Sequence, residues 1–183
     1  DAASLELEPI AVEKKYPGTC VKVMAHLDTI EQQVSVDIGF GDVVTPYPLS
    51  LAYPLLLPDV PAVELYAYSL ETLIAEKFHA MVDRDESNSR MKDFFDVYQL
   101  FTNHEIDREL LAEAIVSTFK NRSTPYRENL ALFTDKFAED ATRNIWWKAF
   151  LKKIRWKEQI GFSVVMRCIK ENLQTYWNKE ALG

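Results

Sequence analysis

A lysine inside the apolar stripe of a predicted helix is the feature that most constrains this chain. Apolar side chains recur at helical spacing at Leu70, Leu73, Ile74 and Met81. Lys77 falls in the same stripe, three residues after Ile74 and four before Met81. An ammonium group on the core-facing side of a helix is costly unless an anion meets it. The fold must therefore bring to Lys77 either a carboxylate of the chain or a phosphate of a substrate.

The next predicted helix supplies two acids. Asp93 lies in or just before its first turn, where a carboxylate is favoured by unpaired N–H groups and the helix dipole, and Asp96 follows one turn later. Arg90 and Lys92 are spaced to pair with these acids along the helix surface. Two interpretations stay open at this point. Lys77 either forms a structural bridge to Asp93 or Asp96, or belongs to an active site.

Strand patterns fill the first third of the chain, and helix patterns fill the rest. The predicted strands are residues 4–12, 19–27, 33–40 and 63–68, and the proline-rich connection over 43–61 leaves room for one short strand. The predicted helices, with Ser69 as the first N-cap, lie near 70–83, 90–102, 107–119, 127–138, 140–154 and 162–181. This order indicates an α+β fold, with a small mixed β-sheet followed by an α-helical C-terminal half. We expect domains at 1–68 and 69–183.

Composition narrows the class of protein. The formal charge of −7 argues against nucleic-acid binding over the whole surface. Cys20 and Cys168 lie far apart and form neither a disulfide framework nor a zinc pattern, so we expect a reduced, cytoplasmic protein. The longest apolar stretches are interrupted by Pro, Asp or Lys, so we expect no membrane span.

Asp37 is a candidate metal ligand on the clearest predicted strand. Val34, Val36 and Ile38 share one face of this strand, which places Asp37 on the other. A carboxylate on a sheet face can hold Mg²⁺ together with substrate phosphates. A metal centre for phosphoryl transfer needs two or three converging acids, however. The other interpretation is a solvated side chain.

A basic segment with tryptophans lies near the end of the chain. Between residues 141 and 170 there are eight basic residues and one acid, together with Trp146, Trp147 and Trp156. Such a segment can bind RNA phosphates and bases, or an acidic partner. The favoured interpretation is a helix with a lysine-rich solvent face and a core stripe at Ile145, Trp146, Ala149, Phe150 and Ile154.

The two helices around Lys77 and Asp93 resemble a block of the AbiEii/AbiGii-type toxin family nucleotidyltransferases. The similar residues are Leu73-Ile-Ala-Glu-Lys77-Phe-His-Ala, Arg84, and Ser89-Arg-Met-Lys-Asp93-Phe-Phe-Asp96-Val-Tyr. The stretch Val36-Asp-Ile-Gly-Phe-Gly-Asp42 is similar to the strand that precedes this block in the family. The resemblance spans roughly residues 20–105.

This resemblance implies a bacterial, toxin-like enzyme that uses Mg²⁺ to move a nucleotide from an NTP to an acceptor, such as tRNA or a protein, with a cognate antitoxin as partner. Lys77 is then expected to contact the triphosphate, Asp93 to complete or support catalysis, and Asp37 to lie near the metal. The further substrate-binding residues implied are Arg84, Arg90 and Asp96.

The resemblance also implies an N-terminal Gly-Ser turn followed by Asp-x-Asp, and this signature does not occur among the 183 residues. We therefore expect an incomplete chain whose remaining metal-binding acids lie upstream of Asp1 and which does not transfer nucleotides alone. The alternative is a non-catalytic module, derived from this fold, that binds a protein or RNA. In that module Lys77 and Asp93 form a structural bridge.

Overall fold

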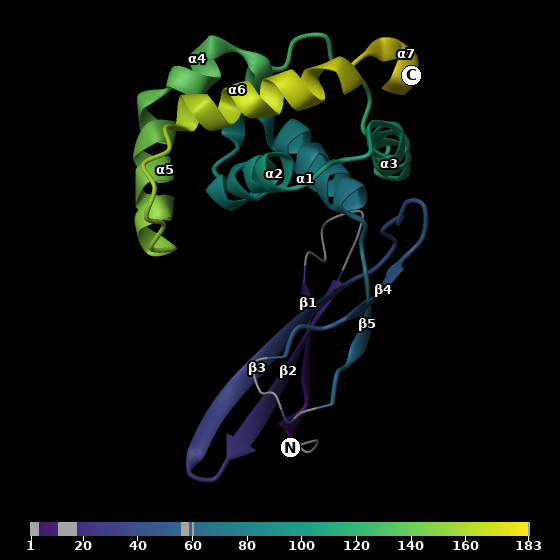
Figure 1. The fold of residues 1–183 in the computed structure, drawn as a ribbon, viewed down its shortest axis with the longest axis vertical. Helices are drawn as coiled ribbons and strands as arrows, with labels where there is room; N and C mark the ends of the chain where they lie inside the picture. Colours follow the sequence, from purple (N-terminus) through teal and green to yellow (C-terminus); the bar gives the residue numbers. More distant parts are fainter. Residues whose placement is uncertain (1–3, 11–17, 56–58, 60, 183) are drawn as a thin grey trace. The chain divides into compact units, whose positions relative to one another are not determined.

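The computed structural model describes residues 4–10, 18–55, 59 and 61–182. The chain forms two compact units, Asp1–Asp42 and Val43–Gly183, and Figure 1 labels their elements in chain order. The change from strands to helices falls at Ser69. The predicted domain boundary at that position stays a prediction.

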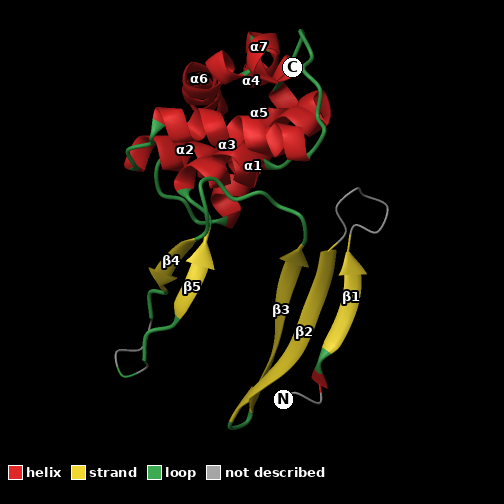
Figure 2. Cartoon of the chain, turned by 90° about the vertical axis from the view of Figure 1, so that its right-hand side faces the viewer, coloured by secondary structure: helices red, strands yellow, loops and turns green. Residues whose placement is uncertain are grey.

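An antiparallel sheet makes up the first unit. Its strands are β1 (Glu6–Ile10), β2 (Gly18–Leu27) and β3 (Ile30–Gly39), in the order β1-β2-β3 (Figure 2). The short turn between β2 and β3 holds Asp28 at a φ of 55°, a left-handed conformation that Asp tolerates better than most residues. The strands predicted at 4–12, 19–27 and 33–40 are confirmed, although residues 11 and 12 lie outside the described part of the chain.

Side chains alternate between the two faces of β3, as the sequence predicts. Val34, Val36 and Ile38 share one face, and their exposed fractions are 42%, 53% and 41%. Asp37 lies on the other face, directly opposite Cys20 of β2. The apolar face of β3 is therefore exposed in the described structure.

The second unit begins with a pair of antiparallel strands. These are β4 (Leu49–Ala52), inside the proline-rich connection, and β5 (Glu64–Ala67), inside the strand predicted at 63–68. Because strands precede helices along the chain, the α+β class is confirmed. The expected mixed sheet is replaced by two antiparallel sheets among the described strands.

Helices α1 (Leu70–Arg84), α2 (Met91–Asn103) and α3 (Arg108–Asn121) follow, close to their predicted ranges. Side-chain caps fix where α1 and α3 start. The Ser69 hydroxyl accepts a hydrogen bond from Thr72 N at 3.1 Å, and Asp107 Oδ1 accepts from two amides at the start of α3. A 3₁₀ turn, η2 (Asp85–Ser87), leads from α1 toward α2.

The last helices are α4 (Asp135–Glu139), α5 (Ala141–Lys153), α6 (Phe162–Leu173) and α7 (Lys179–Leu182), with 3₁₀ turns η3 (Ala131–Phe133) and η4 (Gln174–Tyr176). No helix in the described ranges has the length and apolar character needed to cross a membrane.

Two helices are shorter than predicted. The helix predicted at 127–138 is reduced to η3 and α4, because extended backbone at Thr134 interrupts it and the Thr134 hydroxyl caps a new start. The helix predicted at 162–181 breaks after Leu173. This break allows Trp177 to turn inward, where its indole N–H donates to Arg127 O at 2.8 Å.

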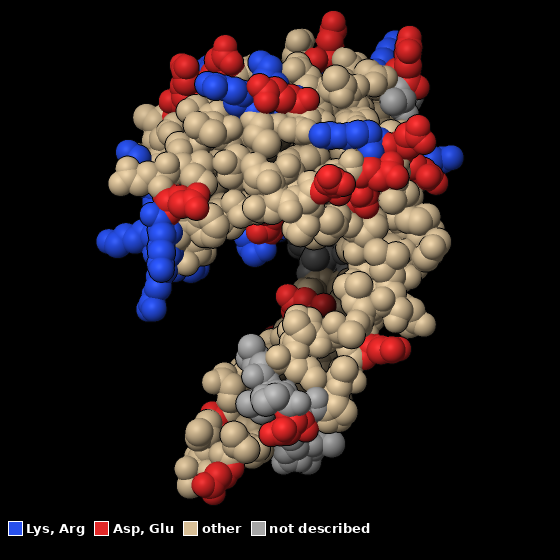
Figure 3. Space-filling model, viewed as in Figure 1, with Lys and Arg blue, Asp and Glu red and all other residues tan. Residues whose placement is uncertain are grey.

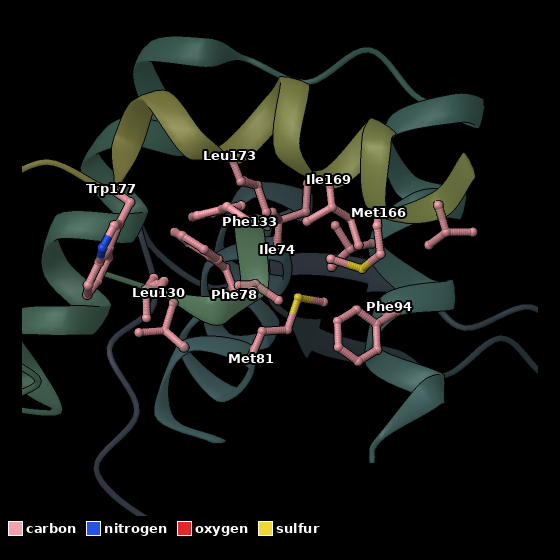
Figure 4. Close-up of a cluster of buried hydrophobic side chains, with 14 of the residues drawn as sticks. Ile74, Phe78, Met81, Phe94, Leu130, Phe133, Met166, Ile169, Leu173 and Trp177 are labelled. Atoms are coloured by element: carbon pink, nitrogen blue, oxygen red, sulfur yellow. The ribbon is translucent and has the colours of Figure 1, made fainter. Parts of the chain in front are cut away.

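One hydrophobic core holds the helices of the second unit together. Ile74, Phe78 and Met81 of α1, Phe94 of α2 and Ile169 of α6 are fully buried. Figure 4 shows these side chains packed beneath α6. Full burial of such a side chain contributes about 1.5–3 kcal/mol relative to exposure. This core fixes the contact between α1 and α2 on which Lys77 lies.

The predicted core stripe of α5 is confirmed at Phe150, which packs against the core, and is wrong at its other positions. Ile145, Trp146 and Ile154 are 65%, 41% and 40% exposed, whereas Trp147 is 1% exposed. The Trp147 ring packs against Phe162, at a centroid distance of 5.6 Å, and its indole N–H donates to the carbonyl of Ile160. Tertiary contacts therefore select Trp147, one residue beyond the predicted tryptophan, to face the core.

Candidate functional site

Lys77 meets both aspartates across the contact between α1 and α2. Its Nζ atom lies 2.6 Å from Asp96 Oδ2 and 3.3 Å from Asp93 Oδ1. The side chain of Lys77 is 14% exposed, and that of Asp93 is 4% exposed. The anion that the sequence demands is therefore supplied by two carboxylates of the chain.

Two further cations surround the same carboxylates. Arg90 Nε lies 2.8 Å from Asp93 Oδ2, and Lys92 Nζ lies 2.5 Å from Asp96 Oδ2. Both pairings were predicted from the helix spacing. We call Lys77, Arg90, Lys92, Asp93 and Asp96 the ion-pair cluster. Its three cations and two carboxylates leave one positive charge in excess, which favours an additional anion.

The entry into α2 positions this cluster. Asn88 is fully buried, and its Oδ1 accepts a hydrogen bond from Arg90 N at 2.8 Å, which fixes the chain just before the helix. Asp93 lies in the first turn, as predicted, where the helix dipole favours a negative charge. The cluster is thus held by a buried amide on one side and by the packed core on the other.

An open cavity of about 430 Å³ lies beside Lys77. Its wall is formed by residues of α1 and α2 and by the residue that follows α2: Leu73, Lys77, Lys92, Phe95, Asp96, Gln99, Leu100, Asn103 and His104. Sequence reasoning missed most of this wall. A signal was present, because Gln99, Leu100 and Asn103 follow Asp96 at i+3, i+4 and i+7 and so share its helix face.

Arg84 does not join the ion-pair cluster in the described structure. It is the half-buried last residue of α1, two turns beyond Lys77. Its backbone carbonyl accepts a hydrogen bond from the Ser87 hydroxyl, which helps to end the helix. Its expected contact with substrate stays a prediction.

Asp37 lies in the first unit, on an exposed position of β3. It forms a cross-strand pair with Cys20, and a hydrogen bond to Asp37, then burial, raises the pKa of the Cys20 thiol. Asp37 thus touches a thiol, and its role beside a metal stays a prediction.

The acids do not gather into a metal site within the described residues. No group of three His, Cys, Asp or Glu side chains that could hold a metal ion occurs among them. The carboxylates of Asp93 and Asp96 each contact two cations instead. Carboxylates already paired with cations are poor ligands for Mg²⁺, which is commonly held by one or two carboxylates together with water and substrate phosphates.

A comparison with known protein families identifies one family that the chain matches. The chain matches the family described as nucleotidyl transferase AbiEii toxin, type IV TA system, over residues 2–163. The match covers more than half of the chain and contains the whole ion-pair cluster. A comparison with curated proteins gives no match. The chain therefore belongs to the AbiEii nucleotidyltransferase toxin family.

Proposed function

We propose that Lys77 contacts the phosphates of an NTP during nucleotidyl transfer. Membership of the family implies an NTP substrate and an antitoxin partner. The observation that carries the proposal is the position of Lys77: its side chain is 14% exposed and lines an open cavity, within a cluster of excess positive charge. Such a group is already oriented before an anion arrives.

The chemistry is a displacement at the α-phosphorus of the NTP. The acceptor oxygen forms a bond to phosphorus, the bond to the bridging oxygen breaks, the acceptor releases its proton, and pyrophosphate leaves with the developing negative charge. In this proposal Lys77 offsets that charge, while Asp93 and Asp96 hold the lysine in place. Arg90, Arg84 and Asp37 remain proposed supporting residues, and tRNA or a protein remains the proposed acceptor.

The described residues do not form a site that fits Mg²⁺. Nucleotidyltransferases of this family typically depend on a metal ion. The carboxylates of the ion-pair cluster are engaged by cations, and the described residues gather no three-ligand site. Mg²⁺ therefore stays a cofactor implied by the family.

A second candidate function follows from the same contacts. Each carboxylate of the cluster already meets two cations, so the cluster could act only as a structural bridge in a non-catalytic interaction module. The two functions predict different results when Lys77 is replaced, because a structural lysine affects folding and a catalytic one affects turnover.

The test compares Lys77→Met with Glu76→Gln. Glu76 is the neighbouring residue of α1, and it forms a similarly buried ion pair, 2.9 Å from Arg122 Nη2, outside the cluster. Transfer of a labelled nucleotide and calorimetric NTP binding are measured on the whole protein. We expect Lys77→Met to lower turnover by about 100-fold or more, while Glu76→Gln lowers stability and leaves turnover near the original value. Equal turnover in both variants would favour the structural bridge.

A further inference from the structure

Helix α5 is attached to the rest of the second unit by a narrow face. Trp147 is its one buried residue within the described chain, flanked by half-buried Phe150 and Leu151. Most other positions of the helix are exposed to solvent. An attachment of this kind leaves most of the helix surface available for contact.

The exposed surface of α5 and of the residues after it is cationic. Residues 141–157 contain six basic side chains and no acid. Arg143 is half-buried, where it pairs with Asp140 and covers the ring of Phe137. The other five are exposed and form no ion pair within the described residues: Lys148, Lys152, Lys153, Arg155 and Lys157. Figure 3 shows blue side chains gathered at the C-terminal end of α5.

An exposed tryptophan lies at one edge of this cationic surface. Trp146 is 41% exposed, and Lys153 follows it at i+7, so the two side chains share one face of the helix two turns apart. Ile145, which is 65% exposed, shares another strip with Lys148 and Lys152 at i+3 and i+7. We call Trp146 together with the five exposed cations the α5 surface.

We infer that the α5 surface binds RNA, with its cations on the phosphates and Trp146 stacked on an unpaired base. Cations without protein partners can neutralise phosphates and release counterions, and an exposed ring beside them provides a stacking platform. Stacking requires an unpaired base, which RNA loops and ends offer. Four of the five cations are lysines, and lysine is depleted in protein–protein interfaces, so RNA fits better than an acidic protein. The inference does not rest on the proposed function, because it uses none of the ion-pair cluster.

The first test replaces three lysines of the α5 surface and measures binding of a fluorescent single-stranded RNA of about 15 nucleotides over about 50–200 mM salt. The triple variant Lys148→Gln, Lys152→Gln, Lys153→Gln is expected to bind more weakly and to lower the salt slope by roughly two. The control carries the same charge change at three exposed lysines elsewhere in the second unit: Lys120→Gln, Lys136→Gln, Lys179→Gln. An equal loss in both triple variants would overturn the inference.

The second test isolates the aromatic contact. Trp146→Ala is expected to weaken RNA binding about fivefold or more. An RNA backbone without bases should bind the original protein and Trp146→Ala equally. Polyglutamate that competes as well as RNA would instead indicate an acidic protein partner and overturn the inference. Lys77→Met should retain RNA binding, which separates this result from the test of NTP chemistry.

Discussion

Asp96 Oδ2 lies 2.6 Å from Lys77 Nζ and 2.5 Å from Lys92 Nζ, so one carboxylate oxygen accepts two ammonium groups. The two lysines differ in burial, because the side chain of Lys77 is 14% exposed and that of Lys92 is 72% exposed. Lys77 also pairs with Asp93, whereas Asp96 is the one ion-pair partner of Lys92 among the described residues. Solvent should therefore screen the contact of Lys92 far more than that of Lys77.

We expect Lys77→Met to lower the free energy of unfolding by about 1–2 kcal/mol. The loss is smaller than for a fully buried pair, because Asp93 keeps Arg90 and Asp96 keeps Lys92. Lys92→Met should change the same free energy by less than about 0.5 kcal/mol. Urea unfolding followed by tryptophan fluorescence measures both. Losses of equal size would show that the Lys77 contact is worth no more than a surface pair.

The ion pairs of Lys77 could be predicted because they depend on residues with clear helical spacing. The cavity beside Lys77 could not, because its wall depends on the angle at which α1 and α2 pack. The sequence also could not show which tryptophan of α5 faces the core, because Trp146 and Trp147 are adjacent and both fit an apolar stripe. Contacts with residues distant in sequence, such as Phe95 and Phe162, decide that Trp147 is buried. The end of α6 at Leu173 was likewise not predicted, because it accompanies a contact distant in sequence, the hydrogen bond from the Trp177 indole N–H to Arg127 O.

Ser69→Ala should lower the free energy of unfolding by about 1–2 kcal/mol. Ser69 is 3% exposed, caps α1 by accepting from Thr72 N, and donates to Thr45 O at 2.8 Å, so its removal leaves two buried backbone groups without this partner. Ser163→Ala in the first turn of α6 is the matched control, because Ser163 is exposed. Chemical denaturation compares the two variants. Indistinguishable midpoints would contradict a capping role for Ser69.

His79 should make stability depend on pH. Burial lowers the pKa of its imidazole, which lies 2.7 Å from Thr124 Oγ1. The unfolded chain therefore binds more protons than the folded one as the pH falls through the ordinary histidine value of about 6.5. The contribution of His79 to the free energy of unfolding is present above that pH, and it is lost as the pH falls toward the folded-state pKa.

The variant His79→Gln should remove this part of the pH dependence. Free energies of unfolding measured at about pH 7.5 and about pH 5.5 should differ less in the variant than in the original protein. If both proteins lose stability in parallel between these two values, protonation of His79 does not contribute.

Asp37→Asn should make Cys20 more reactive. The hydrogen bond to Asp37 and the negative charge of that carboxylate both raise the pKa of the Cys20 thiol, so their removal increases the thiolate fraction. Alkylation at about pH 8 in a Cys168→Ser background should therefore become severalfold faster. Glu31→Gln, on the same face of β3 opposite His26, is the control with the same charge change. A similar acceleration in both variants would point to general charge rather than to the Asp37 contact.

The adjacent tryptophans of α5 should differ in their effects on stability. Trp147 is 1% exposed, and its ring lies 5.7 Å from that of Phe150 and 5.6 Å from that of Phe162. Trp147→Ala should therefore cost about 3–5 kcal/mol, because it leaves a cavity and an unpaired carbonyl at Ile160. Trp146→Ala should cost less than about 1 kcal/mol, since its ring is 41% exposed.

A third variant keeps this comparison informative even if Trp147→Ala does not fold. Trp147→Phe retains a ring in the core and loses the indole N–H bond to Ile160 O, so its stability should fall between those of the original protein and Trp147→Ala. Thermal and urea unfolding rank the variants. If Trp146→Ala proved as costly as Trp147→Ala, the face that α5 turns to solvent would be different. Lys153, the cation that shares that face with Trp146, would then lose its place in an RNA-binding surface.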